Sequence, residues 1–289
     1  MRKLFIKHLI KSNKSKKNYL IINDLGFSVI EPFKNKFPDR IFNAGVSEQN
    51  MMGLAAGIAS ENSNVFVYSI ANFSTFRCAE QIRNDVDYHK LPVTIVSVGS
   101  GVGYGNLGYT HHALQDYALM RSFPNMQILS PGNNNELIAS LNYIQKNPQP
   151  FYLRLDKDEH EEIKLKKIMI SPGSIVKLLD GNKKKIILTT GSVQKLAKQI
   201  RGGKYKKYSV YSMPMWGMKA KNKVKNLIKK FDEIITIEDH FYDGGFGSWL
   251  RECLNNSNIK TKIKSKYIDT NVINEVGSKE YLLSKYGPR

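Results

Sequence analysis

Short, continuously apolar runs alternate along this chain with longer segments of helical period. Such runs are typical of strands buried on both faces of a parallel sheet, because helices cover each face of that sheet. The expected strands are residues 19–23, 65–70, 93–98, 127–129, 151–155, 186–189, 209–213, 234–237 and 262–268. The expected helices span about 47–60, 77–89, 112–122, 133–146, 192–201, 220–231, 245–255 and 275–285.

The alternation predicts an α/β fold with two consecutive doubly wound domains, each built on a mainly parallel sheet. Residues 156–172 are charged and poor in apolar side chains, which is typical of a linker. We therefore expect one domain at residues 1–160 and a second at 161–289. Ligands of such sheets bind in the loops that follow the carboxyl ends of the strands, so we expect the functional residues in those loops.

Composition excludes several other classes of protein. The 289 residues are 41% hydrophobic and 24% charged, which is too apolar for a disordered chain. No apolar run approaches the roughly 18 residues of a membrane span, and residues 1–17 lack the apolar stretch of a signal peptide. Two cysteines cannot build a disulfide framework or a zinc site. We expect a cytoplasmic protein that contacts no membrane and holds no metal ion with its own residues.

The formal charge of +19 is unevenly distributed along the chain. Residues 1–17 carry seven basic and no acidic residues, residues 161–289 carry 27 basic and 12 acidic ones, and the stretch between them is close to neutral. A nucleic-acid-binding surface would interleave lysine or arginine with exposed aromatic residues, whereas these lysines flank apolar strands and helices. We therefore expect a solvated basic surface and no nucleic-acid partner. The alternative, a non-catalytic basic binding module, predicts salt-sensitive binding of nucleic acid.

Glu48 lies in unusual surroundings for a carboxylate. It precedes a helical segment, residues 51–59, that has almost no polar face, and a helix of that kind is expected to be buried on all sides. A carboxylate there is costly unless other groups hydrogen-bond it. An acid in the first turn of a helix can also serve only to complement the helix dipole. The motifs around Glu48 bear on the choice between these two interpretations.

Several motifs of this chain closely resemble those of transketolases and 1-deoxyxylulose-5-phosphate synthases. The first is the cofactor-binding signature at residues 43–57, NAGVSEQNMMGLAAG. The motifs that follow it are EQIRNDV at 80–86, GYTHH at 108–112 and LMRSFPNM at 119–126. TIEDH at 236–240 and GGFGS at 244–248 are similar to the C-terminal domain of the same family. The resemblance covers essentially the whole chain and implies a pyrimidine-binding domain followed by a transketolase C-terminal domain.

The resemblance implies thiamine diphosphate as the cofactor. By position, Glu48 would hydrogen-bond a ring nitrogen of the aminopyrimidine and so be a catalytic residue. Phe73 would stack on the pyrimidine, with Phe76 as the less favoured candidate, and Arg77 would contact the cofactor or the wall of the site. For both phenylalanines, packing in the core is the alternative interpretation.

His111 is the strongest catalytic candidate among the six histidines. It follows a loop with five glycines, residues 99–108, and we expect it to begin a helix with its imidazole facing the strand ends. The resemblance implies that His111 hydrogen-bonds the donor sugar and assists proton transfer, a task suited to an imidazole near neutral pH.

Four more residues are candidates for contacts with the substrate. They are Ser28, Asn106, His112 and Arg154. Ser28 and Arg154 resemble family positions that touch the anionic end of the substrate, and a guanidinium can grip two oxygens at once. For Arg154, a structural ion pair with Asp156 or Asp158 is the alternative.

Two positions depart from the family pattern. Leu107 stands where the family usually has an acid that recognises a hydroxyl of the donor, and Gly99 stands where the family has a phosphate-binding histidine. The departures leave the identity of the donor open. They also suggest the hypothesis that the acceptor is not a plain sugar phosphate but a bulkier substrate, such as a nucleotide-activated sugar.

A whole domain of the family has no counterpart in this chain. Family enzymes hold the diphosphate and its magnesium ion through a Gly-Asp-Gly motif followed by an asparagine, and this sequence contains no Gly-Asp-Gly. We therefore expect an N-terminal transketolase subunit as partner, which supplies diphosphate and magnesium binding. Two copies of each chain would complete two sites.

The resemblance predicts that the two-chain enzyme transfers a two-carbon ketol unit from a ketose to an aldehyde or keto-sugar acceptor. One alternative is the beta subunit of a 2-oxoacid dehydrogenase, which shares the two-domain layout. Another is a carboligase that decarboxylates pyruvate, since Leu107 leaves the donor open.

Overall fold

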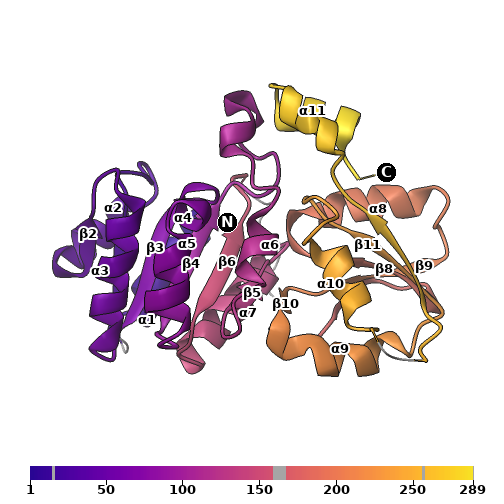
Figure 1. The fold of residues 1–289 in the computed structure, drawn as a ribbon, viewed down its shortest axis with the longest axis horizontal. Coiled ribbons are helices and arrows are strands. Elements are labelled where there is room, and N and C mark those ends of the chain that lie inside the picture. Colours follow the sequence, from indigo (N-terminus) through magenta and orange to yellow (C-terminus); the bar gives the residue numbers. More distant parts are fainter. Residues whose placement is uncertain (15–16, 159–166, 256–257, 289) are drawn as a thin grey trace.

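A computed structural model describes residues 1–14, 17–158, 167–255 and 258–288 of the chain. The expected domain boundary at residue 160 and the middle of the expected linker lie outside the described residues. The chain forms two α/β units, each with a mostly parallel sheet between helices, side by side along the long axis of the molecule (Figure 1). The predicted α/β fold class is confirmed.

The first sheet has seven strands in the order β10-β5-β6-β4-β3-β1-β2, and every pairing except that of β10 is parallel. Its strands are β1 (Asn18–Ile22), β2 (Ile41–Asn43), β3 (Asn64–Ile70), β4 (Val93–Val98), β5 (Gln127–Leu129), β6 (Phe151–Leu155) and β10 (Met215–Trp216). The helices of this unit are α1 (Arg2–Ser12), α2 (Glu31–Lys36), α3 (Glu48–Ser60), α4 (Phe73–Phe76), α5 (Ala79–Gln81), α6 (Asp116–Met120) and α7 (Asn134–Lys146).

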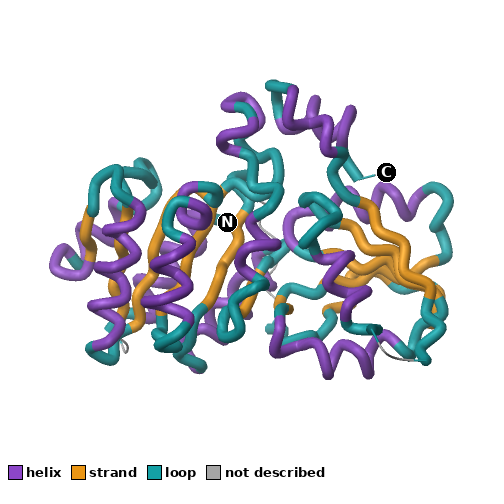
Figure 2. Tube along the Cα trace, viewed as in Figure 1, coloured by secondary structure: helices purple, strands orange, loops and turns teal. Residues whose placement is uncertain are grey.

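The second sheet has five strands in the order β12-β11-β8-β9-β7, with β7 antiparallel to its neighbour β9. Its strands are β7 (Val176–Leu179), β8 (Asn182–Thr189), β9 (Tyr208–Ser212), β11 (Glu233–Ile237) and β12 (Lys262–Lys266). The helices of this unit are α8 (Gln194–Gly202), α9 (Lys221–Ile228), α10 (Phe246–Glu252) and α11 (Lys279–Tyr286). The last of these, α11, leaves its own sheet and lies above the boundary between the two units (Figure 2).

Alternating side chains of β3 show why both faces of the first sheet are covered. Val65 and Val67 pack with α3 in one buried cluster, whereas Phe66 and Tyr68 pack with α1 in another. A strand that is apolar on both faces excludes water only when helices cover each face. The continuous apolar runs of the sequence therefore led to the correct sheet type.

Several elements were not predicted from the sequence. They are α1, α2, α4, β2, β7 and the two-residue strand β10. The expected helix at 77–89 is a short α-helix, α5, followed by a π-helical segment at Ile82–Asp87. Among the described residues, no helix is long and apolar enough to cross a membrane.

Candidate active site

The loops after β1, β3 and β4 meet at the carboxyl edge of the first sheet, at the top of the molecule in Figure 1. Parallel strands place all their carboxyl ends at one edge, which is why residues far apart in sequence gather there. The hydrogen bond from Asn72 Nδ2 to the carbonyl oxygen of Thr110, 2.9 Å, joins two of these loops.

Glu48 is the first residue of α3, and only 5% of it is exposed. Its Oε1 accepts hydrogen bonds from Asn23 Nδ2 at 3.0 Å and from Arg77 Nη1 at 2.8 Å. The ion pair with Arg77 stabilises the charged carboxylate in this buried position. Within the described residues, no hydrogen bond is made by Oε2. This second oxygen is therefore available to a ligand.

Helix α3 is not buried on all sides, and that expectation was wrong for the single chain. Met51, Met52 and Ala55 face the core, but Gly53, Leu54 and Gly57 lie on an exposed face. A Cβ added at either glycine would meet no atom within 4 Å. An exposed apolar helix face is typical of an association surface.

Arg77, Phe73 and His111 continue the group that begins at Glu48. The guanidinium carbon of Arg77 lies 4.1 Å from the centre of the Phe73 ring, within the range of a cation–π contact. The His111 ring meets Phe73 edge-on, with 5.0 Å between ring centres, and its Nδ1 lies 2.9 Å from Thr110 Oγ1. Burial and then the positive charge of Arg77 lower the pKa of His111. The imidazole is therefore neutral near pH 7.

The predicted helix start at His111 is wrong. His111 ends a 3₁₀ turn, Tyr109–His111, and the next α-helix begins only at Asp116. His112 has no exposed surface, and neither ring nitrogen has a hydrogen-bond partner in the described chain. Burial lowers the pKa of His112, so this imidazole is neutral as well.

The two phenylalanines differ in accessibility. Arg77 covers one face of the Phe73 ring, and His111 covers its edge. Phe76 is 45% exposed, so more of its ring is open to a ligand. The geometry gives Phe76 at least as strong a claim to a stacking role as Phe73.

Arg154 is placed differently from the other candidates. It has no exposed side-chain surface and donates six hydrogen bonds within the chain. Its Nε lies 2.7 Å from Asp116, and its Nη1 lies 2.5 Å from Asp239 of the second unit. With every donor engaged, this guanidinium joins the two units and leaves no N–H for a substrate. The ion pair expected as an alternative does form, but with other aspartates than Asp156 or Asp158.

Ser28 and Asn106 are both exposed at this edge. The backbone N–H of Ser28 donates to Glu31. Within the described residues, no direct hydrogen bond links Ser28 or Asn106 to the group around Glu48.

Two residues of this edge were missed from the sequence. Asn23, which binds Glu48, directly follows β1, so its place at a strand end was the available signal. Arg2 begins α1 beside the rings of Tyr68 and Tyr104, whose pKa values it lowers against the larger effect of burial. Its Nε is buried and has no hydrogen-bond partner in the described chain. The signal for α1 was the spacing of Phe5 and Leu9, which are both buried.

The described residues contain no group of three or more His, Cys, Asp or Glu side chains that could hold a metal ion. The fold and the site define an α/β protein built on two mostly parallel sheets, with a buried acid, an arginine and a histidine at the edge of the first sheet.

Residues 13–161 match the family described as the transketolase pyrimidine binding domain, so the chain belongs to the transketolase family. It is 32% identical over 295 residues to a Methanocaldococcus jannaschii protein named as a transketolase C-terminal section, covering 99% of this chain and 92% of that protein. It is 33% identical over 227 residues to an Actinobacillus succinogenes protein named as one of the subunits of apulose-4-phosphate transketolase, covering 78% of this chain and 73% of that protein.

A solved structure gives the same assignment. The structure titled as the inactive beta4 tetramer of a split-gene transketolase has a TM-score of 0.82 and 27% identity to this chain. The match covers 99% of this chain and 93% of that one. The resemblance to the C-terminal half of a split transketolase is thereby confirmed.

Proposed function

We propose that this chain, together with an N-terminal partner subunit, transfers a two-carbon ketol unit from a ketose to an aldehyde or keto-sugar acceptor. The observation that carries the proposal is the buried Glu48 carboxylate, which has one oxygen held by Asn23 and Arg77 and the other unengaged. A carboxylate fixed in this way is suited to hydrogen-bond a ring nitrogen of a ligand in a defined orientation.

The residues around Glu48 fit the aminopyrimidine of thiamine diphosphate. Glu48 Oε2 would receive a ring nitrogen, and the exposed ring of Phe76, or that of Phe73, would stack on the heterocycle. When bound, this cofactor supplies a carbon nucleophile that adds to the carbonyl of a ketose. The chain's own contribution is to orient the pyrimidine and to hold Glu48 in place through Arg77.

His111 is the candidate for proton transfer with the sugar. Its pKa is lowered, so the ring can accept a proton from a substrate hydroxyl near pH 7. Thr110 Oγ1, 2.9 Å from Nδ1, fixes the ring so that Nε2 is the nitrogen left for substrate. Asn106 and Ser28, which are exposed, remain proposed substrate contacts at the same edge, whereas His112 has no exposed surface and is not proposed as one.

The partner subunit would hold the diphosphate and the magnesium ion. The chain has no Gly-Asp-Gly motif, and the exposed face of α3 offers a surface for association. Gly53 and Gly57 lie four residues apart on that face, and the absence of a side chain lets another helix approach closely. Two copies of each chain would complete two sites.

Both cysteines are free and buried, which suits the reducing cytoplasm.

Leu107 and Gly99 bear on the choice of substrate. Leu107 is 55% exposed, so it presents an apolar surface where an acid would recognise a donor hydroxyl. Gly99 stands where the family has a phosphate-binding histidine. The acceptor class therefore extends in our proposal to nucleotide-activated sugars. The chain's relatives named as apulose-4-phosphate transketolase subunits favour ketol transfer over the 2-oxoacid dehydrogenase and carboligase alternatives.

The test is to purify this chain together with the proposed N-terminal partner subunit, one that carries a Gly-Asp-Gly motif, and to assay ketol transfer with thiamine diphosphate and magnesium. We expect Glu48→Gln to lower kcat/KM at least about 100-fold. Asp180→Asn, in the exposed turn between β7 and β8, is the control and should leave turnover unchanged. Full activity of Glu48→Gln would refute the proposal. Turnover of pyruvate instead of a ketose would move the chain to one of the alternatives.

A further inference from the structure

The C-terminal segment, residues 268–287, leaves the second sheet and packs against the loop that carries His111. This loop spans residues 99–112, between β4 and α6. The segment contains a 3₁₀ turn, Thr270–Asn274, and helix α11, which lies at the top of the molecule in Figure 1. The first of these lies against the turn that ends at His111, and α11 lies against the turn Gly105–Leu107. Two elements of the second unit therefore border this loop.

A small apolar core joins the loop to the C-terminal segment. Val102 of the loop is buried in a cluster that is separate from the cores of the two sheets. The members that the segment contributes to this cluster are Ile268, Val272 and Leu282. Apolar side chains shared in this way hold both partners in place, because separation would expose them to water. The docked segment is therefore part of what keeps Val102 out of water.

The backbones of the loop and the segment approach closely at Gly105. The Gly277 N–H donates a hydrogen bond to the Gly105 carbonyl oxygen at 3.3 Å. A Cβ added to Gly105 would lie 2.5 Å from the Gly277 carbonyl oxygen and 2.6 Å from Leu282 Cδ1. Both distances are too short for an unstrained contact, so this approach requires glycine at residue 105.

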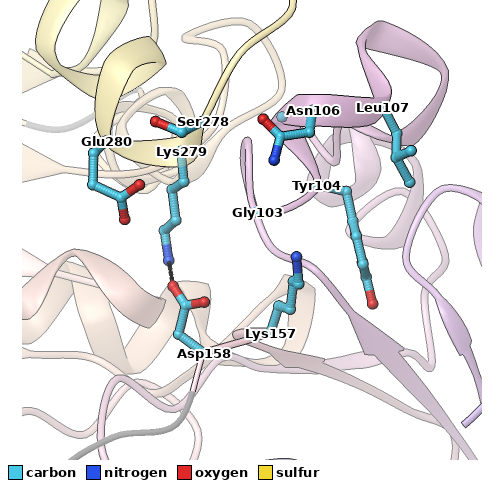
Figure 3. A pocket seen from close by; sticks show the side chains of 10 residues that line it. Gly103, Tyr104, Asn106, Leu107, Lys157, Asp158, Ser278, Lys279 and Glu280 are labelled. Atoms are coloured by element: carbon cyan, nitrogen blue, oxygen red, sulfur yellow. Dashed lines mark hydrogen bonds and ion pairs between the residues drawn. The ribbon is translucent and has the colours of Figure 1, made fainter. Parts of the chain in front are cut away.

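Lys279 attaches the start of α11 to the strand end from which the loop begins. Its ammonium lies 2.9 and 3.0 Å from the two carboxylate oxygens of Asp156 and 2.7 Å from a carboxylate oxygen of Asp158. Figure 3, a close view of the pocket at the mouth of the proposed site, shows the Lys279 side chain directed at Asp158. Asp156 directly follows β6, and Leu155, the last residue of β6, accepts a hydrogen bond from the Gly99 N–H. Because Lys279 and Asp156 are mostly buried, their ion pair is screened less by solvent than a surface pair.

The position of the His111 ring follows from the position of this loop. His111 ends a 3₁₀ turn, and its N–H donates to the Gly108 carbonyl oxygen at 3.0 Å. Asn72, which follows β3, holds the same turn through the Thr110 carbonyl oxygen. The C-terminal segment borders this turn as well, so a shift of the segment would move His111 relative to Glu48.

We infer that the C-terminal segment holds the His111 loop in its reactive arrangement and that Lys279 is a positioning residue for His111. The role of His111 in proton transfer rests on the proposed function, whereas the packing of the segment on the loop is a property of the chain itself. The ammonium of Lys279 is engaged by two aspartates. It therefore acts on His111 through the fold and does not contact substrate.

Hydrogen–deuterium exchange of the full chain, read by mass spectrometry, tests the packing without any catalysis. Lys279→Gln removes the ion pairs, and we expect the amides of residues 99–112 to exchange at least about tenfold faster while those of β1 and β3 stay unchanged. Lys279→Arg keeps the charge and should restore most of the protection. Lys285→Gln is the matched control, because Lys285 lies on the same helix but pairs with Glu275 within the segment. Unchanged exchange of residues 99–112 in Lys279→Gln would overturn the inference.

A milder variant covers the case in which Lys279→Gln loses its fold and exchanges faster everywhere. Asp158→Ala removes one of the contacts of Lys279 at an exposed residue. It should speed the exchange of residues 99–112 about threefold and leave the rest of the chain unchanged. If this variant also left the loop unchanged, the segment would not hold the loop through Lys279.

A double-mutant cycle in the two-chain enzyme tests whether Lys279 acts through His111. Lys279→Gln should lower kcat for ketol transfer about tenfold and change KM less than about twofold, and Lys279→Arg should recover most of kcat. In a His111→Gln background, Lys279→Gln should change kcat less than about twofold, because the group that Lys279 positions is then absent. Equal losses in both backgrounds would contradict the positioning role. Absence of ketol transfer in every variant, together with faster exchange of residues 99–112 in Lys279→Gln, would refute the proposed function alone.

Discussion

Replacement of Arg154 by methionine is expected to destabilise the chain strongly. The side chain has no exposed surface, and its loss would leave Asp116 and Asp239, 0% and 6% exposed, without a cation. Each aspartate would keep one hydroxyl donor, Tyr152 at 2.6 Å for Asp116 and Ser192 at 2.8 Å for Asp239. Removal of one partner from a buried ion pair costs about 3 to 5 kcal/mol. The fraction of unfolded chain would rise roughly a thousandfold.

Urea unfolding followed by tryptophan fluorescence measures this loss. Trp216 stacks edge-on against Tyr117, 4.9 Å away between ring centres, so it reports on the surroundings of Arg154. Arg121→Met is the matched control, since Arg121 also bridges the two units but pairs with a partly exposed Glu252. An exposed pair contributes about 1 kcal/mol or less.

The reasoning about Arg154 can be refuted in two ways. A loss below about 1 kcal/mol for Arg154→Met, equal to that of Arg121→Met, would show that the buried pair contributes no more than a surface pair. The second check is the double variant Arg154→Met with Asp116→Asn. Because it removes one of the two stranded charges, it should recover part of the lost stability. A further decrease would contradict the charge argument.

Three more predictions concern single residues. Burial raises the pKa of Glu238 to about 8, above its ordinary 4.5, so its protonated form favours the fold and stability falls as pH rises toward 8. From pH 6.5 to 8 the free energy of unfolding should drop by about 1.5 kcal/mol, and Glu238→Gln should remove this slope in urea titrations. Gly53→Ala should raise the free energy of unfolding of the chain by roughly 0.5 to 1 kcal/mol. It should also weaken the association of the chain with its partner, measured by sedimentation. Unchanged association would exclude the α3 face as the interface. Phe76→Leu should raise the Kd of the two-chain enzyme for thiamine diphosphate more than Phe73→Leu does, and the reverse order would assign the stacking role to Phe73.

Strand β8 begins with four polar residues, but several other strands that pair on both sides were predictable because they are largely apolar runs. β3 and β4 are examples, with every central residue buried. β10 was not predictable, because Met215 and Trp216 form only two residues of strand and pair with β5 of the other unit. A sequence pattern of two residues carries no periodicity. Helix α1 was overlooked because its lysines resemble a charged tail, although Phe5 and Leu9 are buried.

The site was predictable in its composition and less so in its contacts. Glu48, Arg77 and His111 do gather at one edge, as parallel strands require. Arg154 illustrates the limit. From the sequence its nearest acids were Asp156 and Asp158, but its actual partners lie 38 and 85 residues away, and only the packing of the two units brings them close.

The two-residue strand β10 has a consequence for any shortened form of this protein. Met215 and Trp216 cover the outer edge of β5, and the indole N–H of Trp216 donates to Thr190 at 3.0 Å. A truncation that removed the second unit would expose the backbone N–H and C=O groups of β5 as an open sheet edge. Open edges pair readily with other molecules. The first unit expressed alone would therefore be prone to aggregation, although every residue proposed around the pyrimidine would still be present.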